Sequence, residues 1–137
     1  MSKSAENDAS RINMTDPPEL IAKKVKSCKT DAFVGLEWDN AERPECQNLL
    51  TLYSLVTGAS KDAVAAEVGA MSWGEFKPRL ADALVEHLRP FQATYAEAMG
   101  DLGALDRVLA DGAAAANEAA NTTVERVRDA MGFLPPV

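Results

Sequence analysis

The segment FKPRLADALVEHLRPFQATYAEAM, residues 76–99, decides the fold class of this chain. Its apolar side chains recur at every third or fourth position, which is the spacing of one face of an α-helix. This face comprises Phe76, Leu80, Leu84, His87, Leu88, Phe91, Tyr95 and Met99. Pro90 lies inside the pattern, where it removes one backbone hydrogen bond and crowds the preceding turn. The pattern predicts one long helix near residues 75–99, bent at Pro90.

Shorter helical patterns precede this segment. Asp16 can cap a helix over residues 16–29. Pro17 fits the first position of this helix, because its ring fixes φ near the helical value. Its apolar residues form one stripe, and its lysines are expected to point largely elsewhere. Two more patterns cover residues 44–58 and 60–69, and each closes on a glycine. Three helices are therefore expected before the long one.

Helical patterns also follow the long segment. Residues 105–109 predict one or two further turns, and a final helix is expected to begin at Asp111 or Gly112 and to end at Gly132. Small residues in this last helix allow another helix to approach closely. No alternation of apolar and polar residues persists anywhere. The predicted fold class is all-α: a bundle of five or six helices around one core, preceded by a flexible N-terminal loop.

Composition and charge exclude several classes of protein. The length of 137 residues and the hydrophobic content of 47% suit one folded domain. No apolar run reaches the roughly 18–20 residues of a membrane span, no signal peptide is visible, and two cysteines make no disulfide framework. Residues 1–30 carry six basic and four acidic residues, or +2, whereas the rest carries 8 basic and 17 acidic, or −9. Contact with a polyanion should therefore concentrate near the N-terminal third.

A group of lysines in this basic third has two interpretations. Its members are Lys23, Lys24, Lys26 and Lys29. They can form a solvated helix face, or a face that contacts nucleic-acid phosphates, because no acidic residue interrupts the stretch. Trp38 and Trp73, both near turns, can likewise stack on an unpaired base or cover an edge of the core. The residues alone leave both alternatives open.

Residues 30–137 show no recognisable active site. Cys28, Cys46 and His87 are too few and too scattered for a zinc site, which needs four Cys or His ligands at characteristic spacings. Both cysteines fall on apolar helix faces, so they are expected to be core thiols. His87 is expected to lie on a helix face or to be partly buried. No metal site is predicted.

The chain begins with Met1-Ser2-Lys3-Ser4, a short Ser/Lys stretch that means little alone. In its setting, MSKSAENDASRIN and the helical segments after it resemble the KMSKS loop and C-terminal helical domain of bacterial-type tryptophanyl-tRNA synthetases, a family of class I enzymes. The resemblance covers essentially the whole chain in order. MSKS is shared by many class I synthetases, whereas NLLTLYSLVTG (residues 48–58) and LRPFQATY (residues 88–95) resemble the tryptophan enzyme in particular.

The resemblance implies a division into an ATP loop over residues 1–15 and a helical domain over residues 16–137 on the anticodon side of tRNA(Trp). Lys3 matches the second lysine of the family motif, so it is expected to stabilise the negative charge on the departing pyrophosphate. Ser2 and Ser4 are expected to donate hydrogen bonds to the ATP phosphates. The four lysines of residues 23–29 would then contact tRNA phosphates.

The complete enzyme that the resemblance implies charges tRNA(Trp) with tryptophan in a reaction driven by ATP, which binds with Mg²⁺. It would be a homodimer that binds no membrane, located in the cytoplasm, or in a chloroplast or mitochondrion of a eukaryote. Some family members bind an iron–sulfur cluster through four cysteines, which the two cysteines of this chain do not permit.

Two departures from the family pattern lead to an alternative. The family motif begins with a lysine that this chain lacks, and the nucleotide-binding fold, the HIGH-like motif and the tryptophan pocket are also missing. The chain is therefore expected to be a fragment, inactive by itself. The alternative is a free-standing helical interaction module without catalytic activity, in which MSKS is a relic or a coincidence.

Overall fold

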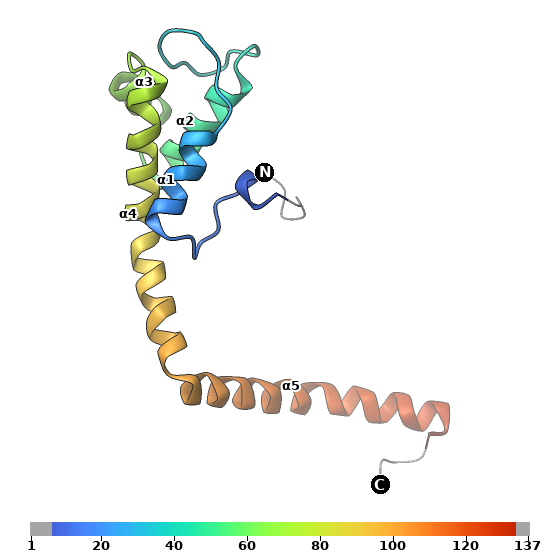
Figure 1. Ribbon diagram of the computed structural model, residues 1–137. Coiled ribbons are helices and arrows are strands. Elements are labelled where there is room, and N and C mark those ends of the chain that lie inside the picture. Colours follow the sequence, from blue (N-terminus) through green and yellow to red (C-terminus); the bar gives the residue numbers. More distant parts are fainter. Residues whose placement is uncertain (1–6, 134–137) are drawn as a thin grey trace. The chain divides into compact units, whose positions relative to one another are not determined.

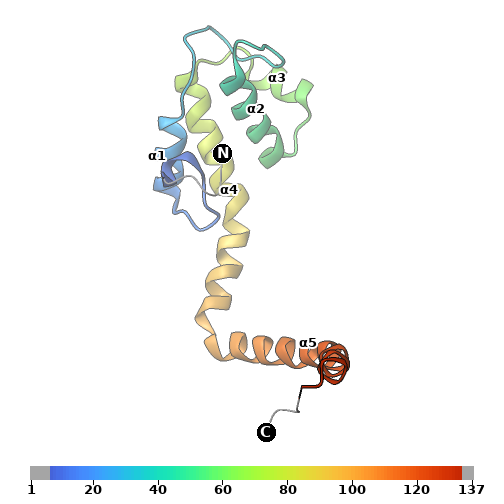
Figure 2. The same ribbon diagram turned by 90° about the vertical axis from the view of Figure 1, so that its right-hand side faces the viewer.

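The computed structural model describes residues 7–133, and this part of the chain is helical without any strand. A 3-10 helix, η1 (Asp8–Ser10), is followed by five α-helices (Figures 1 and 2). The α-helices are α1 (Pro18–Ser27), α2 (Pro44–Thr57), α3 (Lys61–Val68), α4 (Trp73–Gly100) and α5 (Leu102–Met131). The predicted all-α fold class is confirmed. No helix among these residues is both long enough and apolar enough to cross a membrane.

The chain divides between Ala93 and Thr94 into two compact units. The first unit contains a hydrophobic core to which α1, α2, α3 and the first half of α4 contribute. Its buried apolar residues are Ile21, Val25, Leu36, Cys46, Leu49, Leu50, Tyr53, Val64, Val68, Phe76, Leu80, Ala81, Leu84 and Leu88. Most of these are the stripe residues expected from the helical spacing. Burial of this apolar surface stabilises the first unit.

Local signals set most of the helix ends. The side chain of Ser60 accepts a hydrogen bond from the Ala63 amide at the start of α3. Before α4, the Glu75 carboxylate accepts bonds from the Ser72 amide and from its hydroxyl, both at 2.8 Å. The helix α2 ends at Gly58, whose φ of 70° is left-handed.

The start of α1 differs from the prediction. Pro17 is the N-cap and Pro18 is the first helical residue, so the helix begins one residue later than expected. Asp16 does not cap α1, because its carboxylate is bound by the Asn13 amide and by the Lys24 ammonium. The carboxylate therefore fixes the chain before the helix to the middle of the helix.

The long helix α4 covers the predicted segment and continues through Pro90 without interruption. The bend at Pro90 stays a prediction. In the second unit, the expected break between residues 109 and 111 is wrong, because α5 is one continuous helix. It begins after Asp101, whose side chain accepts a bond from the Ala104 amide at 2.8 Å, and it ends at Gly132 as predicted. α5 contributes no buried residue.

Candidate functional site

The predicted ATP-loop residues Ser2, Lys3 and Ser4 lie outside the residues that the structure describes. The description begins at Asn7, which caps η1 through a hydrogen bond from the Ala9 amide to its side chain at 2.9 Å. Residues 7–17 therefore connect the MSKS tetrapeptide with helix α1. The hydrogen bonds and ion pairs that hold residues 8–16 are the first feature of the site.

A buried ammonium group holds the connection against α1. The Lys24 Nζ atom lies 2.6 Å from an oxygen of Asp16 and 2.7 Å from an oxygen of Asp8. The amide side chain of Asn13 donates to both carboxylates, at 3.0 Å to Asp8 and 3.2 Å to Asp16. Gln92 of α4 donates to the carbonyl groups of Met14 and Asp16, at 2.9 and 3.0 Å. These bonds fix residues 8–16 to two helices.

This arrangement corrects one expectation about the lysine group. The Lys24 side chain is only 5% exposed, so it points inward rather than away from the apolar stripe. Its hydrogen bonds to Asp16 and Asp8 raise its pKa, and its bond to Asp8 lowers the pKa of that carboxyl to about 2. Burial opposes the ionisation of Asp16, but bonds from Lys24 and Asn13 outweigh it and lower the pKa. Lys24 is therefore charged and bound within the protein.

The remaining lysines of the group lie on the surface. Lys23 and Lys26 are exposed, and Lys29 is exposed with its ammonium 2.8 Å from Glu45. Lys77 of α4 adds a cation that sequence reasoning missed, because it donates to the carbonyl groups of Lys26 and Cys28 at the end of α1. Because 49 residues separate Lys77 from Cys28, no local pattern predicts this contact. The one sequence signal for it is that Lys77 lies early in the long helix.

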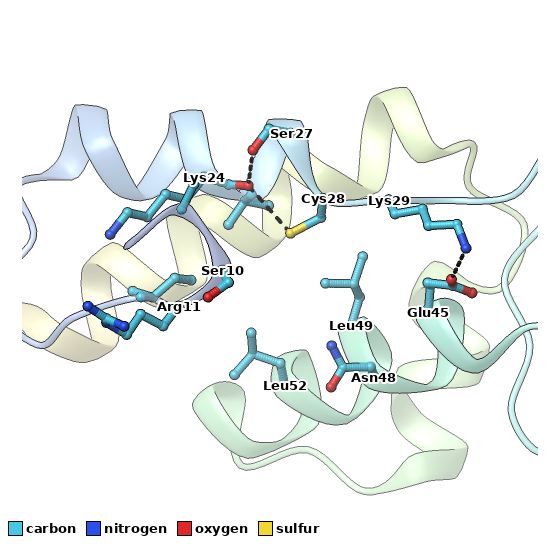
Figure 3. Close-up of a pocket in the computed structure, with 13 residues that line it drawn as sticks. Ser10, Arg11, Lys24, Ser27, Cys28, Lys29, Glu45, Asn48, Leu49 and Leu52 are labelled. Carbon is cyan, nitrogen blue, oxygen red and sulfur yellow. Dashed lines mark hydrogen bonds and ion pairs between the residues drawn. The ribbon is translucent and has the colours of Figure 1, made fainter. Parts of the chain in front are cut away.

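A pocket of about 300 Å³ lies between η1, α1 and α2. Its apolar wall includes Val25, Leu49 and Leu52, and Figure 3 shows the Cys28 sulfur directed toward the Lys24 carbonyl at its edge. The charged groups around it are already paired, as the Lys29–Glu45 contact illustrates. The Cys28 thiol and the Lys29–Glu45 pair are thus engaged within the protein at the edge of this pocket.

A second pocket, of about 420 Å³, lies between α1 and α4. It is mostly apolar, and its lining residues are Ala22, Lys26, Trp73, Gly74, Lys77, Pro78 and Ala81. Trp73 packs against the core with its ring centroid 6.1 Å from that of Phe76, and its indole donates to Asp31 at 3.2 Å. It therefore covers an edge of the core and also faces the pocket beside two lysines.

Trp38 covers another edge of the core. The Lys61 ammonium lies 5.0 Å from the centroid of the Trp38 ring, and the indole Nε1 atom is buried without a hydrogen-bond partner in the described part of the chain. For both tryptophans, the structure thus agrees with the interpretation that they cover the core.

The segment between α1 and α2 is held by Arg43, which sequence reasoning missed. Its guanidinium is 1% exposed and donates to both oxygens of Asp31, at 2.8 and 3.0 Å, and to the Gly35 carbonyl at 2.8 Å. The Arg43 bonds lower the pKa of Asp31 despite the opposing effect of burial. No local pattern predicts this pair, because its two members are separated by an irregular loop.

The cysteines and the histidine occupy ordinary positions. Cys46 is completely buried in the core, which confirms that prediction, and burial raises the pKa of its thiol. Cys28 is half-buried and packs against the core. His87 is exposed, with its Nδ1 atom 3.2 Å from the Val56 carbonyl oxygen. Among residues 7–133, no three His, Cys, Asp or Glu side chains lie where they could hold a metal ion.

Comparisons with known proteins identify the class to which this helical architecture and its preceding motif belong. The family described as "tRNA synthetases class I (W and Y)" matches residues 1–89, which is more than half of the chain. The chain therefore belongs to the class I tRNA synthetase family of the tryptophan and tyrosine enzymes.

Individual relatives narrow the likeness to the tryptophan enzymes. The chain is 55% identical to the tryptophan–tRNA ligase of Synechocystis sp. over 99% of its own length and 40% of the relative's length. It is 53% identical to the chloroplastic/mitochondrial tryptophan–tRNA ligase of Arabidopsis thaliana, over 97% of this chain and 33% of that one. The crystal structure of tryptophanyl-tRNA synthetase from Mycoplasma pneumoniae matches with a TM-score of 0.63 at 25% identity, over 98% of this chain and 42% of the other. The chain thus spans about two fifths of the length of such relatives.

Proposed function

We propose that the chain is the C-terminal portion of a tryptophan–tRNA ligase, an enzyme that activates tryptophan with ATP and transfers it to tRNA(Trp). The observation that carries this proposal is the 55% identity to such a ligase along 99% of the chain. A free-standing interaction module has no need to keep half of its residues in common with an enzyme along its entire length.

In this reaction the tryptophan carboxylate attacks the α-phosphate of ATP, which is bound with Mg²⁺, and pyrophosphate leaves. Negative charge grows on the pyrophosphate, so an ammonium that closes onto it stabilises the transition state more than the ground state. Lys3 has the point charge and the flexible stem for this role. Ser2 and Ser4 donate hydrogen bonds to the phosphates. The cluster around Lys24 supports the proposal, because it ties residues 8–16 behind the MSKS motif to the helical core.

We assign the helical part to contact with tRNA. The exposed lysines Lys23, Lys26 and Lys29 supply charge for phosphate contacts, whereas Lys24 is engaged inside the protein. The complete enzyme acts as a homodimer in the cytoplasm, or in an organelle if the source is eukaryotic. The name of the Arabidopsis relative supports the organellar alternative.

A chimera tests this proposal. The part of the Synechocystis ligase that this chain does not cover, about three fifths of its length, is fused ahead of residues 1–137. The fusion is expected to catalyse tryptophan-dependent ATP–pyrophosphate exchange and to aminoacylate tRNA(Trp). The 137-residue chain alone is expected to show neither activity, because the loop residues act only when ATP and tryptophan are already held by the other part of the enzyme. A folded but inactive chimera would favour the free-standing helical module instead. The matched control is the complete Synechocystis enzyme.

A further inference from the structure

The cluster around Lys24 holds a segment that apolar burial does not hold. The 3-10 helix η1 buries none of its residues. Its Asp8 is nevertheless fixed to α1, because the Lys24 Nζ atom donates to the Asp8 carboxylate at 2.7 Å across 16 residues of sequence. The Lys24 side chain is 5% exposed, whereas that of Asp8 is 50% exposed. The group that fixes η1 is therefore an ammonium inside the protein.

Such a contact is a costly way to stabilise a fold. A charged group inside a protein loses its hydration, and a well-packed apolar residue in its place is often equally stable or more so. Here the charges are satisfied, because Asp16 binds the same ammonium at 2.6 Å and the Asn13 side chain donates to both carboxylates. A fully bonded ionic network fits the need for one defined geometry better than a need for stability alone. The geometry it defines is that of residues 8–16 on α1.

The position of Asp8 in the chain gives this geometry a consequence for Lys3. The two residues are five positions apart, so their Cα atoms are separated by at most about 18 Å. Without the bond to Lys24, the first residue that packs against the core is Ile12, nine positions from Lys3. Lengthening this connection from five to nine residues lowers the effective concentration of its end by about 2.4-fold, because that concentration falls as the −3/2 power of length. Wrong orientation of the ammonium adds to this loss.

We propose that Lys24 is a positioning residue for adenylate formation, which acts through Asp8 by keeping the Lys3 ammonium within reach of the departing pyrophosphate. This inference rests on the proposed ligase function. Lys24 touches no substrate in this role, because its ammonium is buried between Asp8 and Asp16. Gln92 of α4 supports the same segment from a second helix, through its bonds to two backbone carbonyl groups.

The experiment uses the chimera with the Synechocystis ligase and measures pre-steady-state adenylate formation. Lys24→Met is expected to lower this rate about tenfold with little change in tryptophan affinity, because a misplaced ammonium weakens a contact of the transition state. Asp8→Asn removes the ion pair to η1 but leaves Lys24 paired with Asp16. It is expected to lower the rate about two- to threefold, and it provides the test if Lys24→Met does not fold.

Two comparisons separate positioning from stability. In a chimera that carries Lys3→Ala, Lys24→Met should change the rate less than about twofold, because no ammonium remains to be placed. Arg43→Met is the matched control, since it breaks another buried ion pair of the first unit and should lower the free energy of unfolding without lowering the adenylate rate.

Three results would overturn the inference. They are an undiminished loss in the Lys3→Ala background, an equal loss of rate in Arg43→Met, and unchanged rates in both Lys24→Met and Asp8→Asn. A folded chimera without any activity would instead reject the proposed function, and this inference with it.

Discussion

At the scale of single residues, two buried cations hold the irregular parts of the first unit. Arg43, at the start of α2, binds Asp31 of the loop before that helix, and Lys24 of α1 binds Asp8 and Asp16 of the segment before α1. Buried charges are costly unless hydrogen bonds satisfy them, and both cations have several. Removing either cation leaves carboxylates without their counter-ion, which is why these positions are sensitive to substitution.

Substitution of Arg43 is expected to destabilise the protein strongly. Arg43→Met keeps much of the side-chain volume but leaves Asp31 and the Gly35 carbonyl without their donor. Breaking a buried pair from one side costs about 3 kcal/mol in the free energy of unfolding. Urea unfolding followed by circular dichroism measures it. The control is Arg89→Met, since Arg89 and Glu86 form an exposed pair whose loss should cost under about 0.5 kcal/mol. Similar losses in both variants would contradict the role assigned to Arg43.

The carboxylates around Lys24 predict a decline of stability in acid. The pKa of Asp8 is about 2 in the folded protein, against an ordinary 3.8, and the pKa of Asp16 is also lowered. A lowered pKa in the folded state means that the ionised carboxylate stabilises the fold above about pH 4, and that this stabilisation is lost as the pH falls toward 2.

The Lys24→Met variant isolates this contribution. Without the ammonium, the pKa values of Asp8 and Asp16 return toward or above their ordinary range, so the urea midpoint should fall less between about pH 4 and pH 2 than in the unchanged chain. Lys23→Met, one residue away and exposed, should keep the original pH dependence. Identical curves for the Lys24 variant and the unchanged chain would show that the cluster contributes nothing in acid.

Residue-scale pairing was the least predictable feature of the sequence. Cys46 could be predicted as a core thiol, because it lies on the apolar stripe of its own helix. Lys24 could not, because its inward direction depends on Asp8, which precedes the helical pattern, and on Asp16, which was expected to cap the helix instead. Arg43 and Lys77 likewise bind groups from other elements. Periodicity describes which face of a helix is apolar, but not which charge is satisfied by a distant loop.

At the scale of elements, the helices were predictable where caps and periodicity agreed. Ser72 and Glu75 form a capping box at the start of α4, and α2 ends at Gly58 as predicted. The predicted break near Gly112 was wrong because a glycine inside a helix costs only about 1 kcal/mol relative to alanine. The alanine-rich sequence on both sides and the Asp101 cap carry α5 across it.

Alanine substitutions test two glycines in different positions, one inside a helix and one at a helix end. Gly112→Ala should stabilise α5 by about 0.5–1 kcal/mol, because the site is inside a helix and nothing lies within 4 Å of the added Cβ atom. Gly58→Ala also meets open space, but its φ of +70° is unfavourable for alanine and should cost about 1 kcal/mol. Thermal unfolding monitored by circular dichroism compares the two. A lower melting temperature for Gly112→Ala would contradict a continuous α5, and a higher one for Gly58→Ala would contradict the left-handed backbone at the end of α2.

At the scale of the whole molecule, the fold and the candidate site differ in how far the sequence determines them. Hydrophobic spacing alone predicts an all-α protein, because each helix needs an apolar face. Hydrophobic spacing provides no evidence for the candidate ATP loop. Lys3 gains a role only from the resemblance of MSKS and the rest of the chain to a family, since its proposed substrates are bound by a domain that these 137 residues do not include.

The complete enzyme provides the test that separates Lys3 from the lysines of α1. In the chimera, Lys3→Ala should mainly lower the rate of adenylate formation, by about a hundredfold, with little change in tryptophan affinity, because the lost contact belongs to the transition state. Lys26→Ala should leave that rate nearly intact and weaken tRNA binding, with a shallower dependence on salt because one phosphate contact is lost. Pre-steady-state adenylate formation and tRNA binding at several salt concentrations measure both effects. Equal, small changes in the rate for the two variants would reduce Lys3 to a solvated residue, whereas an unchanged salt dependence would remove Lys26 from the tRNA contact.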